Sequence, residues 1–161
     1  MFNLKAELYL KIIFLLSFIA LISAFFIEYV LGHQPCNLCL IERIPYGLSI
    51  IIIIVTFLTK KNQKFLVLLL ILTFIFSFTI SFYHYGIEQG FFQESSICGL
   101  KNFTESITKE DLLKQLSEKT ISCRDVTFRI FGLSLTSINI VINLLFIITL
   151  LKIFNKYEKH K

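Results

Sequence analysis

Four long apolar runs divide this sequence, and they constrain the fold more than any other feature does. The runs cover residues 12–27, 44–59, 65–83 and 130–151. A helix that crosses a lipid bilayer needs about 20 predominantly apolar residues, with a range of about 17 to 25. The last two runs reach this length by themselves, and the first two reach it with their flanking residues. We therefore predict an all-α membrane protein, built as a bundle of four transmembrane helices.

The whole chain, residues 1–161, is expected to form a single integral membrane domain. With 55% hydrophobic and only 17% charged residues, it is too apolar for a soluble domain with a polar surface. A cleaved signal peptide, cut near Ser23 and Ala24, is the alternative for the first run. An uncleaved helix is favoured because the apolar stretch exceeds the usual length of about 7 to 15 residues. The expected helices cover about residues 8–30, 44–59, 65–83 and 130–151, and the expected external loops cover about residues 31–43 and 84–129.

The distribution of Lys and Arg predicts the orientation in the membrane. The net charge of +5 is not arranged as a basic stripe with interleaved aromatic residues, so nucleic acid is not an expected partner. Nine of the 16 cations lie in the N-terminal segment, in the loop at residues 60–64 and in the C-terminal tail. Since Lys and Arg are enriched in cytoplasmic loops, we expect both termini and this loop on the cytoplasmic side.

All four cysteines then lie on the opposite, external side. Cys36 and Cys39 follow the first helix, and Cys98 and Cys123 lie in the long loop between the third and fourth helices. Disulfides persist in external and periplasmic compartments. Four cysteines allow three pairings, and two separate redox couples result if Cys36 pairs with Cys39 and Cys98 pairs with Cys123. We favour a relay in which the loop pair meets a soluble thiol and the other pair meets a carrier dissolved in the membrane.

The C-x-x-C motif at residues 36–39 is the main candidate for chemistry. A disulfide across so small a ring stabilises a fold little, because stabilisation in the chain-entropy model grows with loop length. The motif therefore indicates thiol–disulfide exchange or, as half of a tetrahedral site, zinc binding. Arg43 adds a cation that favours a thiolate and can donate hydrogen bonds to a quinone carbonyl, with phospholipid phosphate as its alternative partner. Pro45 is expected to mark the start of the second helix.

Polar residues near the later spans are further candidates. His84, at the end of the third span, is either a hydrogen-bonded structural group or a donor to a polar head group at the lipid boundary. In the loop, residues 107–116 carry a capping box and a narrow apolar stripe, which predict a short amphipathic helix. Small and polar residues recur along one face of the fourth span, and that face is expected to look into the bundle because unpaired amides are costly against lipid. They are Gly132, Thr136, Asn139 and Asn143.

Three segments of the sequence also match the motifs of a known family. Residues 35–46 match the pattern P-C-x-L-C-x-x-Q-R-x-P-Y, residues 83–89 match Y-H-x-G-V-E-Q, and residues 131–139 match F-G-L-S followed by an Asn. In combination the chain resembles the DsbB family, the disulfide bond formation protein B of bacterial inner membranes, over about residues 8–150. Glu42 departs from the pattern because Gln is usual there.

The resemblance implies a thiol:quinone oxidoreductase of the bacterial inner membrane. The partners it implies are a periplasmic DsbA-like protein of thioredoxin fold and the membrane quinone pool, with ubiquinone or menaquinone as the cofactor. Carried over from the family, Cys98 would be attacked by the thiolate of the soluble protein. Cys123 would resolve the mixed disulfide or transfer it to Cys36.

The same resemblance implies the quinone side of the site. Cys39 would pass the electrons to quinone beside Arg43, and His84 would lie near the quinone ring. Two other classes stay open on the residues alone. One is a metal-binding membrane protein that uses the thiols, and the other is a tetraspan scaffold with structural disulfides.

Overall fold

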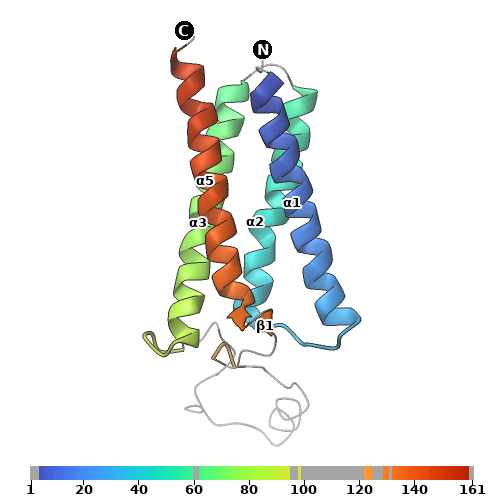
Figure 1. Cartoon of the computed structure of the whole chain (residues 1–161), viewed down its shortest axis with the longest axis vertical. Coiled ribbons are helices and arrows are strands. Elements are labelled where there is room, and N and C mark those ends of the chain that lie inside the picture. The colour runs from blue at the N-terminus through green and yellow to red at the C-terminus, as the bar shows by residue number, and fades with distance from the viewer. Residues whose placement is uncertain are drawn as a thin grey trace, which may run out of the picture.

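The computed structural model describes residues 4–59, 62–94, 98, 122–124, 129–130 and 132–159. Its long elements are four helices that run side by side, with both ends of the chain at the same end of the bundle (Figure 1). Each helix is long and apolar enough to cross a membrane, so the predicted all-α bundle of four membrane-spanning helices is confirmed. The helices are α1 (Leu4–Tyr29), α2 (Asn37–Leu58), α3 (Gln63–Glu88) and α5 (Leu135–Lys159).

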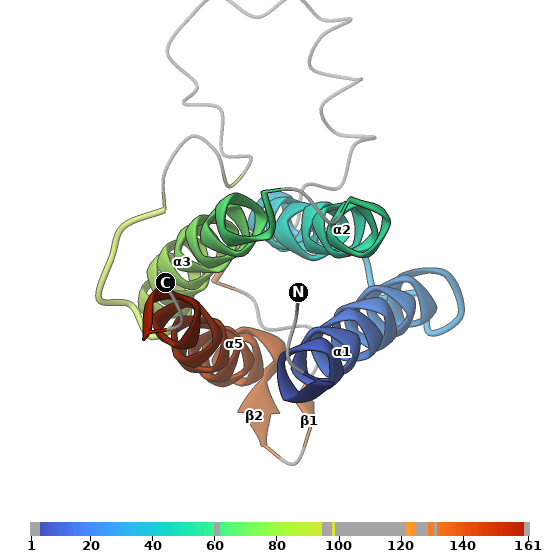
Figure 2. The same cartoon turned by 90° about the horizontal axis from the view of Figure 1, so that it is seen from above.

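The helices form a ring in the order α1, α2, α3, α5, as the view along the bundle shows (Figure 2). Helices α3 and α5 pack together along most of their length, whereas α1 and α5 touch least. Phe74 of α3 lies in the core, where its ring centroid is 4.9 Å from that of Phe146 and 6.2 Å from that of Tyr46. The seam between α1 and α5 is therefore the least closed side of the bundle.

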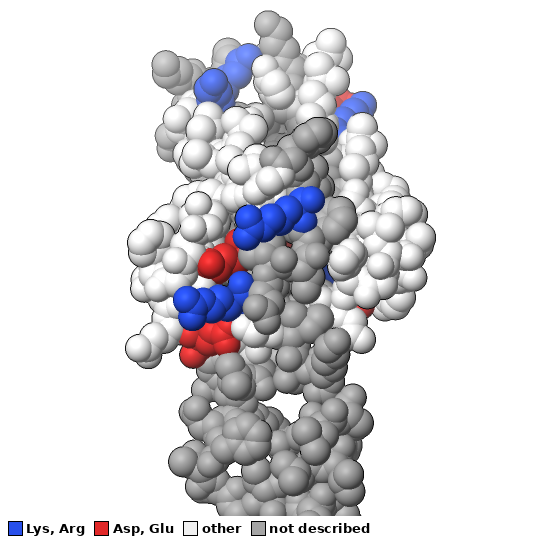
Figure 3. Space-filling view, turned by 60° about the horizontal axis from the view of Figure 1, so that its bottom comes forward, with Lys and Arg blue, Asp and Glu red and all other residues white. Residues whose placement is uncertain are grey.

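The outer surface of the bundle is suited to lipid. Large apolar side chains are exposed along all four helices, including Phe26, Ile51, Phe76 and Leu145. The space-filling view shows some charged side chains at its top and others in its middle, beside the grey residues, with uncharged side chains between the two groups (Figure 3). Lipid tails are as apolar as these side chains, so exposure of this kind is the expected arrangement in a bilayer.

Helix α2 begins seven residues before the expected start, and the prediction that Pro45 marks this start is wrong. Pro45 lies inside the helix, and Cys36 is the residue that caps its N-terminus. Proline removes one backbone hydrogen bond, and such a loss is tolerated in membrane helices because neighbouring groups satisfy the freed carbonyl. The earlier start matters for function because it places Cys39 and Arg43 on successive turns of one helix.

The other helix ends also differ from the apolar runs. Helix α3 continues to Glu88 and so includes His84. Helix α5 starts at Leu135, because the preceding residues form a two-stranded antiparallel pair, β1 (Arg129–Ile130) and β2 (Leu133–Ser134). Gly132 lies in the turn between them with φ of 82°, a conformation that glycine adopts without strain. The amphipathic helix expected at residues 107–116 lies outside the described residues.

Candidate redox site

The C-x-x-C motif forms the N-terminus of α2. Cys36 and Cys39 are free thiols with their Sγ atoms 2.8 Å apart, and the Cys39 backbone N–H donates to Cys36 Sγ at 3.3 Å. The hydrogen bond from Cys39 lowers the pKa of the Cys36 thiol to about 4, helped by His84 and opposed by burial. Cys36 is therefore the more acidic thiol of the pair, and a thiolate is the form that attacks disulfides.

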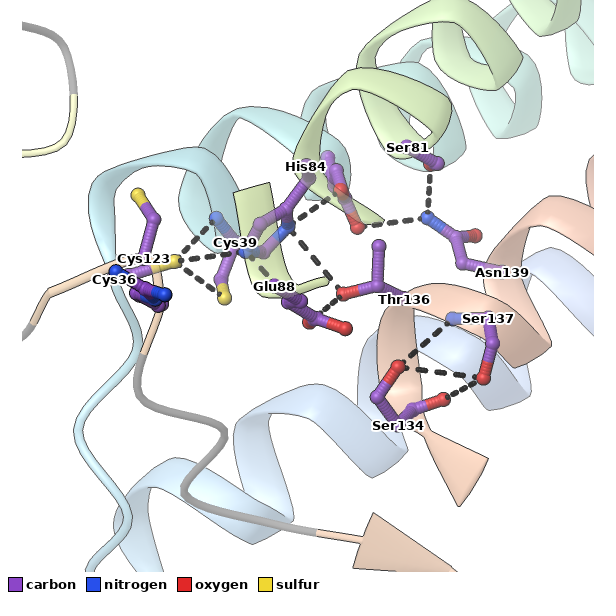
Figure 4. Close-up of polar contacts among 12 residues, drawn as sticks. Cys36, Cys39, Ser81, His84, Glu88, Cys123, Ser134, Thr136, Ser137 and Asn139 are labelled. Carbon is purple, nitrogen blue, oxygen red and sulfur yellow. Dashed lines mark hydrogen bonds and ion pairs between the residues drawn. The ribbon is translucent and has the colours of Figure 1, made fainter. Parts of the chain in front are cut away.

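The imidazole of His84 lies between Cys36 and a carboxylate. Its Nε2 is 3.6 Å from Cys36 Sγ, and its Nδ1 is 2.9 Å from Glu42 Oε1 (Figure 4). His84 is only 2% exposed, and it lines a cavity of the bundle. The structure therefore places His84 next to the thiols, and the carboxylate of Glu42 fixes the orientation of the imidazole ring.

Glu42 continues this polar chain into the bundle. Asn139 of α5 donates from Nδ2 to Glu42 Oε2 at 2.9 Å and to Ser81 Oγ at 2.8 Å. The Tyr46 hydroxyl donates to Oδ1 of the same Asn139. These bonds join α2, α3 and α5 in the interior, where unpaired polar groups are costly. The polar face predicted for the fourth span does look into the bundle at Thr136, Asn139 and Asn143.

Arg43 points toward α1 and forms an ion pair with Glu28 of that helix. The two side chains are only 16% and 21% exposed, and the guanidinium carbon lies 5.2 Å from the centre of the Phe25 ring. A cation at this depth is costly unless a counter-ion or ligand stabilises it. Here a carboxylate of the neighbouring helix provides part of that stabilisation.

A cavity of about 410 Å³ opens beside these groups. Its apolar wall comes mainly from α1, and its polar end contains both thiols. The volume lies within the usual range for small-molecule sites of about 300 to 1,000 Å³. An apolar wall with a few polar groups suits an amphipathic ring with carbonyl groups, such as a quinone. The polar groups at its end come from Cys36, Cys39, Arg43, His84, Glu88 and Thr136.

The second cysteine pair lies against the first. Cys98 and Cys123 form a disulfide with their Cα atoms 5.6 Å apart, and both belong to the buried cluster that contains Cys36. The backbone N–H of Arg124 donates to Glu94 Oε1 at 2.9 Å, which ties this part of the loop to the chain that leaves α3. The structure thus places a disulfide and a dithiol at one end of the bundle.

Comparison with known proteins agrees with this arrangement of helices and cysteines. The model of the family described as disulfide bond formation protein DsbB matches residues 6–153. The chain belongs to the DsbB family. The resemblance found in the sequence motifs is therefore confirmed, and this DsbB-family chain is a membrane oxidoreductase of disulfide bond formation.

A relative of this DsbB-family chain occurs in Rickettsia prowazekii (strain Madrid E). The two are 31% identical over 137 residues, which cover 84% of this chain and 80% of the relative. That relative is itself an uncharacterized protein. No solved structure matches the chain.

The reduced thiols of this DsbB-family site also offer ligands for a metal. The Sγ atoms of Cys36 and Cys39 and a ring nitrogen of His84 all lie within 4.8 Å of one another. In a tetrahedral zinc site with Zn–S bonds of about 2.3 Å, two sulfurs would lie about 3.8 Å apart. The two sulfurs lie 2.8 Å apart, so they would have to separate by about 1 Å to hold a zinc ion.

Sequence reasoning on this DsbB-family chain missed two acidic residues of the site. Glu28 directly follows the first apolar run and is the partner of Arg43. Glu88 lies within the motif at residues 83–89, and its side chain is 5% exposed and lies 3.9 Å from His84. One signal was present, because Glu88 follows His84 by four residues and such residues share a helix face.

Proposed function

We propose that this chain is a membrane thiol:quinone oxidoreductase. It reoxidises a periplasmic DsbA-like protein of thioredoxin fold and passes the electrons through two cysteine pairs to ubiquinone or menaquinone. The observation that carries this proposal is the placement of a disulfide and a dithiol in contact, beside a cavity with an apolar wall. A disulfide can accept electrons from a soluble dithiol, and a dithiol can release them.

The loop pair takes part in the first half of the reaction. A thiolate of the soluble protein attacks Cys98, and the Cys98–Cys123 bond breaks with Cys123 as the leaving thiolate. The second thiolate of the soluble protein then attacks the mixed disulfide. The soluble protein is left oxidised, and Cys98 and Cys123 hold two electrons.

The second half transfers these electrons to the C-x-x-C pair. Cys123 attacks Cys36 in a Cys36–Cys39 disulfide, and closure of Cys98 onto Cys123 restores the loop disulfide. Cys36 and Cys39 are then both reduced. Cys98 and Cys123 lie in one buried cluster with Cys36, and Cys39 packs against it, which supports transfer between the two pairs.

The cavity is the proposed site for quinone, which supplies an acceptor for two electrons and two protons. Cys39 lines the cavity and is less buried than Cys36, so it is the sulfur from which we expect the electrons to leave. Arg43 lines the same cavity and has N–H groups beyond the one that binds Glu28, which can bind a carbonyl oxygen. His84 lines the cavity next to Cys36 and can relay a proton.

We propose the bacterial inner membrane as the location, with the termini in the cytoplasm. The excess of Lys at the terminal end of the bundle supports this orientation. It places the two cysteine pairs on the periplasmic side, where disulfides persist.

The proposal is tested with the purified, oxidised protein in detergent. It is mixed with quinone and a reduced thioredoxin-fold dithiol, and the loss of quinone absorbance is followed. Cys39→Ser should abolish quinone reduction. Thr149→Val, on the exposed side of α5, is the control and should retain it. Equal activity of the Cys39 variant, or no turnover of the unmodified protein with any common quinone, would contradict the proposal.

A metal-binding protein is the second candidate, because three soft ligands of Cys36, Cys39 and His84 lie together. It predicts stoichiometric zinc in the purified, reduced protein and loss of that zinc in Cys39→Ser. A structural scaffold, in contrast, predicts a Cys98–Cys123 bond that resists mild reductant. The redox proposal expects this bond to exchange readily with a dithiol.

A further inference from the structure

Glu88 is buried at the cavity with half of its carboxylate unused. Its Oε1 accepts a hydrogen bond from Thr136 Oγ1 at 2.6 Å and lies 3.9 Å from His84 Nε2. Its Oε2 has no hydrogen-bond partner among the described residues, although it is buried. An unpaired buried carboxylate oxygen is costly. The cost is relieved if Oε2 carries a proton or accepts a hydrogen bond from a molecule in the cavity.

The groups around Glu88 can supply that proton. The titratable groups that face this cluster are Cys36, Cys39 and Glu42 from α2 and His84 from α3, while Thr136 adds a hydroxyl from α5. The nearby cation of Arg43 is paired with Glu28. Cys36, Glu42 and Glu88 all lie next to the imidazole of His84. A proton that Cys36 releases can therefore pass to the imidazole and on to a carboxylate. Both oxygens of Glu42 already have partners, so Glu88 Oε2 is the open position.

We propose that Glu88 is a proton carrier, which takes the proton of Cys36 by way of His84 and exchanges it with the molecule bound in the cavity. This inference rests on the proposed thiol:quinone activity. As a carboxylic acid, Glu88 donates a hydrogen bond from Oε2 to a carbonyl oxygen. As a carboxylate, it accepts one from a hydroxyl at the same atom. The same side chain thus suits both the oxidised and the reduced form of a quinone.

Protons and electrons balance in this scheme. Reduction of the Cys36–Cys39 disulfide adds two electrons and two protons. One proton stays on the Cys39 thiol, and the other passes from Cys36 to His84 Nε2 and on to Glu88. When the Cys36–Cys39 bond forms again, two electrons leave the sulfurs. The Cys39 proton and the proton on Glu88 leave with them, which is the number that reduction of a quinone to a hydroquinone consumes.

The first test is made on the protein without quinone. Infrared difference spectra between the chemically reduced and oxidised protein should contain a C=O stretching band of a protonated carboxyl group. We expect this band to vanish in Glu88→Gln, which keeps the size of the side chain and an oxygen for Thr136. Ser77→Ala is the matched control, since Ser77 Oγ is the other buried side-chain atom without a partner in the described part of the chain. The control should keep the band.

A band that persists in Glu88→Gln would overturn the proposal, and so would the absence of a carboxyl band from the unmodified protein. Glu42→Gln identifies the source of a persisting band, because Glu42 is the other carboxylate next to His84.

The second test separates Glu88 from the proposed activity as a whole. Loss of an acid–base group costs about 10²-fold to 10⁴-fold in rate, so Glu88→Gln should reduce quinone turnover about 10²-fold. Its rate of disulfide exchange with the soluble dithiol should stay unchanged. Glu88→Asp, which keeps a carboxyl group, should recover part of the turnover.

Normal turnover in Glu88→Gln would overturn the role of Glu88 and leave the oxidoreductase proposal intact. Failure of the unmodified protein to reduce quinone would instead overturn the oxidoreductase proposal, whatever the infrared result.

Discussion

Cys36 Sγ and His84 Nε2 lie 3.6 Å apart although the two residues are 48 positions apart in the chain. The contact joins the N-terminus of α2 to the last turns of α3. It gives the buried thiol a partner that accepts its proton, and Glu42 holds the imidazole in place from the opposite side at 2.9 Å.

The acidity of Cys36 predicts how it reacts with an alkylating reagent. Its pKa is lowered from 9.0 to about 4, with the Cys39 hydrogen bond as the largest cause and His84 as a further one. The alkylation rate of Cys36, followed by mass spectrometry, should therefore be nearly constant at neutral pH. In Cys39→Ala the rate should rise only as the pH approaches 9, and His84→Gln should shift the profile less in the same direction.

The lowered pKa of Cys36 also makes the free energy of unfolding depend on pH. Because the pKa of Cys36 is lower in the folded than in the unfolded state, the thiolate stabilises the reduced protein fully above pH 9.0. This contribution shrinks as the pH falls and is lost near pH 4. An alkylation profile of Cys39→Ala identical to that of the unmodified protein would show that the hydrogen bond from Cys39 does not lower the pKa of Cys36.

The ion pair between Glu28 and Arg43 should stabilise the contact between α1 and α2. Glu28→Gln leaves a partly buried cation without its counter-ion. Breaking an exposed ion pair costs little, whereas breaking a fully buried one costs about 3 to 5 kcal/mol. For this partly buried pair we expect the free energy of unfolding to fall by about 1 to 3 kcal/mol. Thermal unfolding in detergent measures the loss.

The double variant Glu28→Gln with Arg43→Gln tests the pairing. It should be more stable than Glu28→Gln alone, because the uncompensated charge is gone. Strictly additive losses in the double variant would show that the two side chains do not interact.

Cys98 should serve the protein partner and not the cavity. Cys98→Ala should block the formation of a mixed disulfide with a reduced thioredoxin-fold dithiol. Binding of quinone should remain, because Cys98 does not line the cavity, whereas its partner Cys123, which does, is left in place. Quinone binding is measured by fluorescence quenching or by equilibrium dialysis in detergent. Loss of quinone binding in Cys98→Ala would contradict this division of roles between Cys98 and the cavity.

Gly86 should be intolerant of a side chain. A Cβ atom there would overlap the ring of Phe92, and that ring stacks on Tyr83 with a centroid distance of 5.7 Å. We expect Gly86→Ala to destabilise the protein by about 1 to 3 kcal/mol, the usual cost of overpacking. Gly47→Ala is the control, because a Cβ atom at Gly47 meets nothing within 4 Å among the described residues. Equal unfolding temperatures for the two variants would contradict this packing.

Local features of the sequence determined the class of the protein. Four apolar runs of bilayer length predicted four membrane-spanning helices, because each helix must satisfy its own backbone within the lipid. The spacing of Cys36 and Cys39 predicted thiol–disulfide exchange or metal binding, since a disulfide in so small a ring stabilises a fold little. The motifs at residues 35–46 and 83–89 predicted the family.

The tertiary structure decided which polar groups meet. Glu28 with Arg43, His84 with Cys36, and Asn139 with Glu42 are contacts between different helices. They depend on how far each helix is rotated about its axis and shifted along it. Hydropathy does not contain this information, because lipid-facing and buried positions of these helices are almost equally apolar. The proximity of Glu88 to the thiols therefore became visible only when the helices were packed.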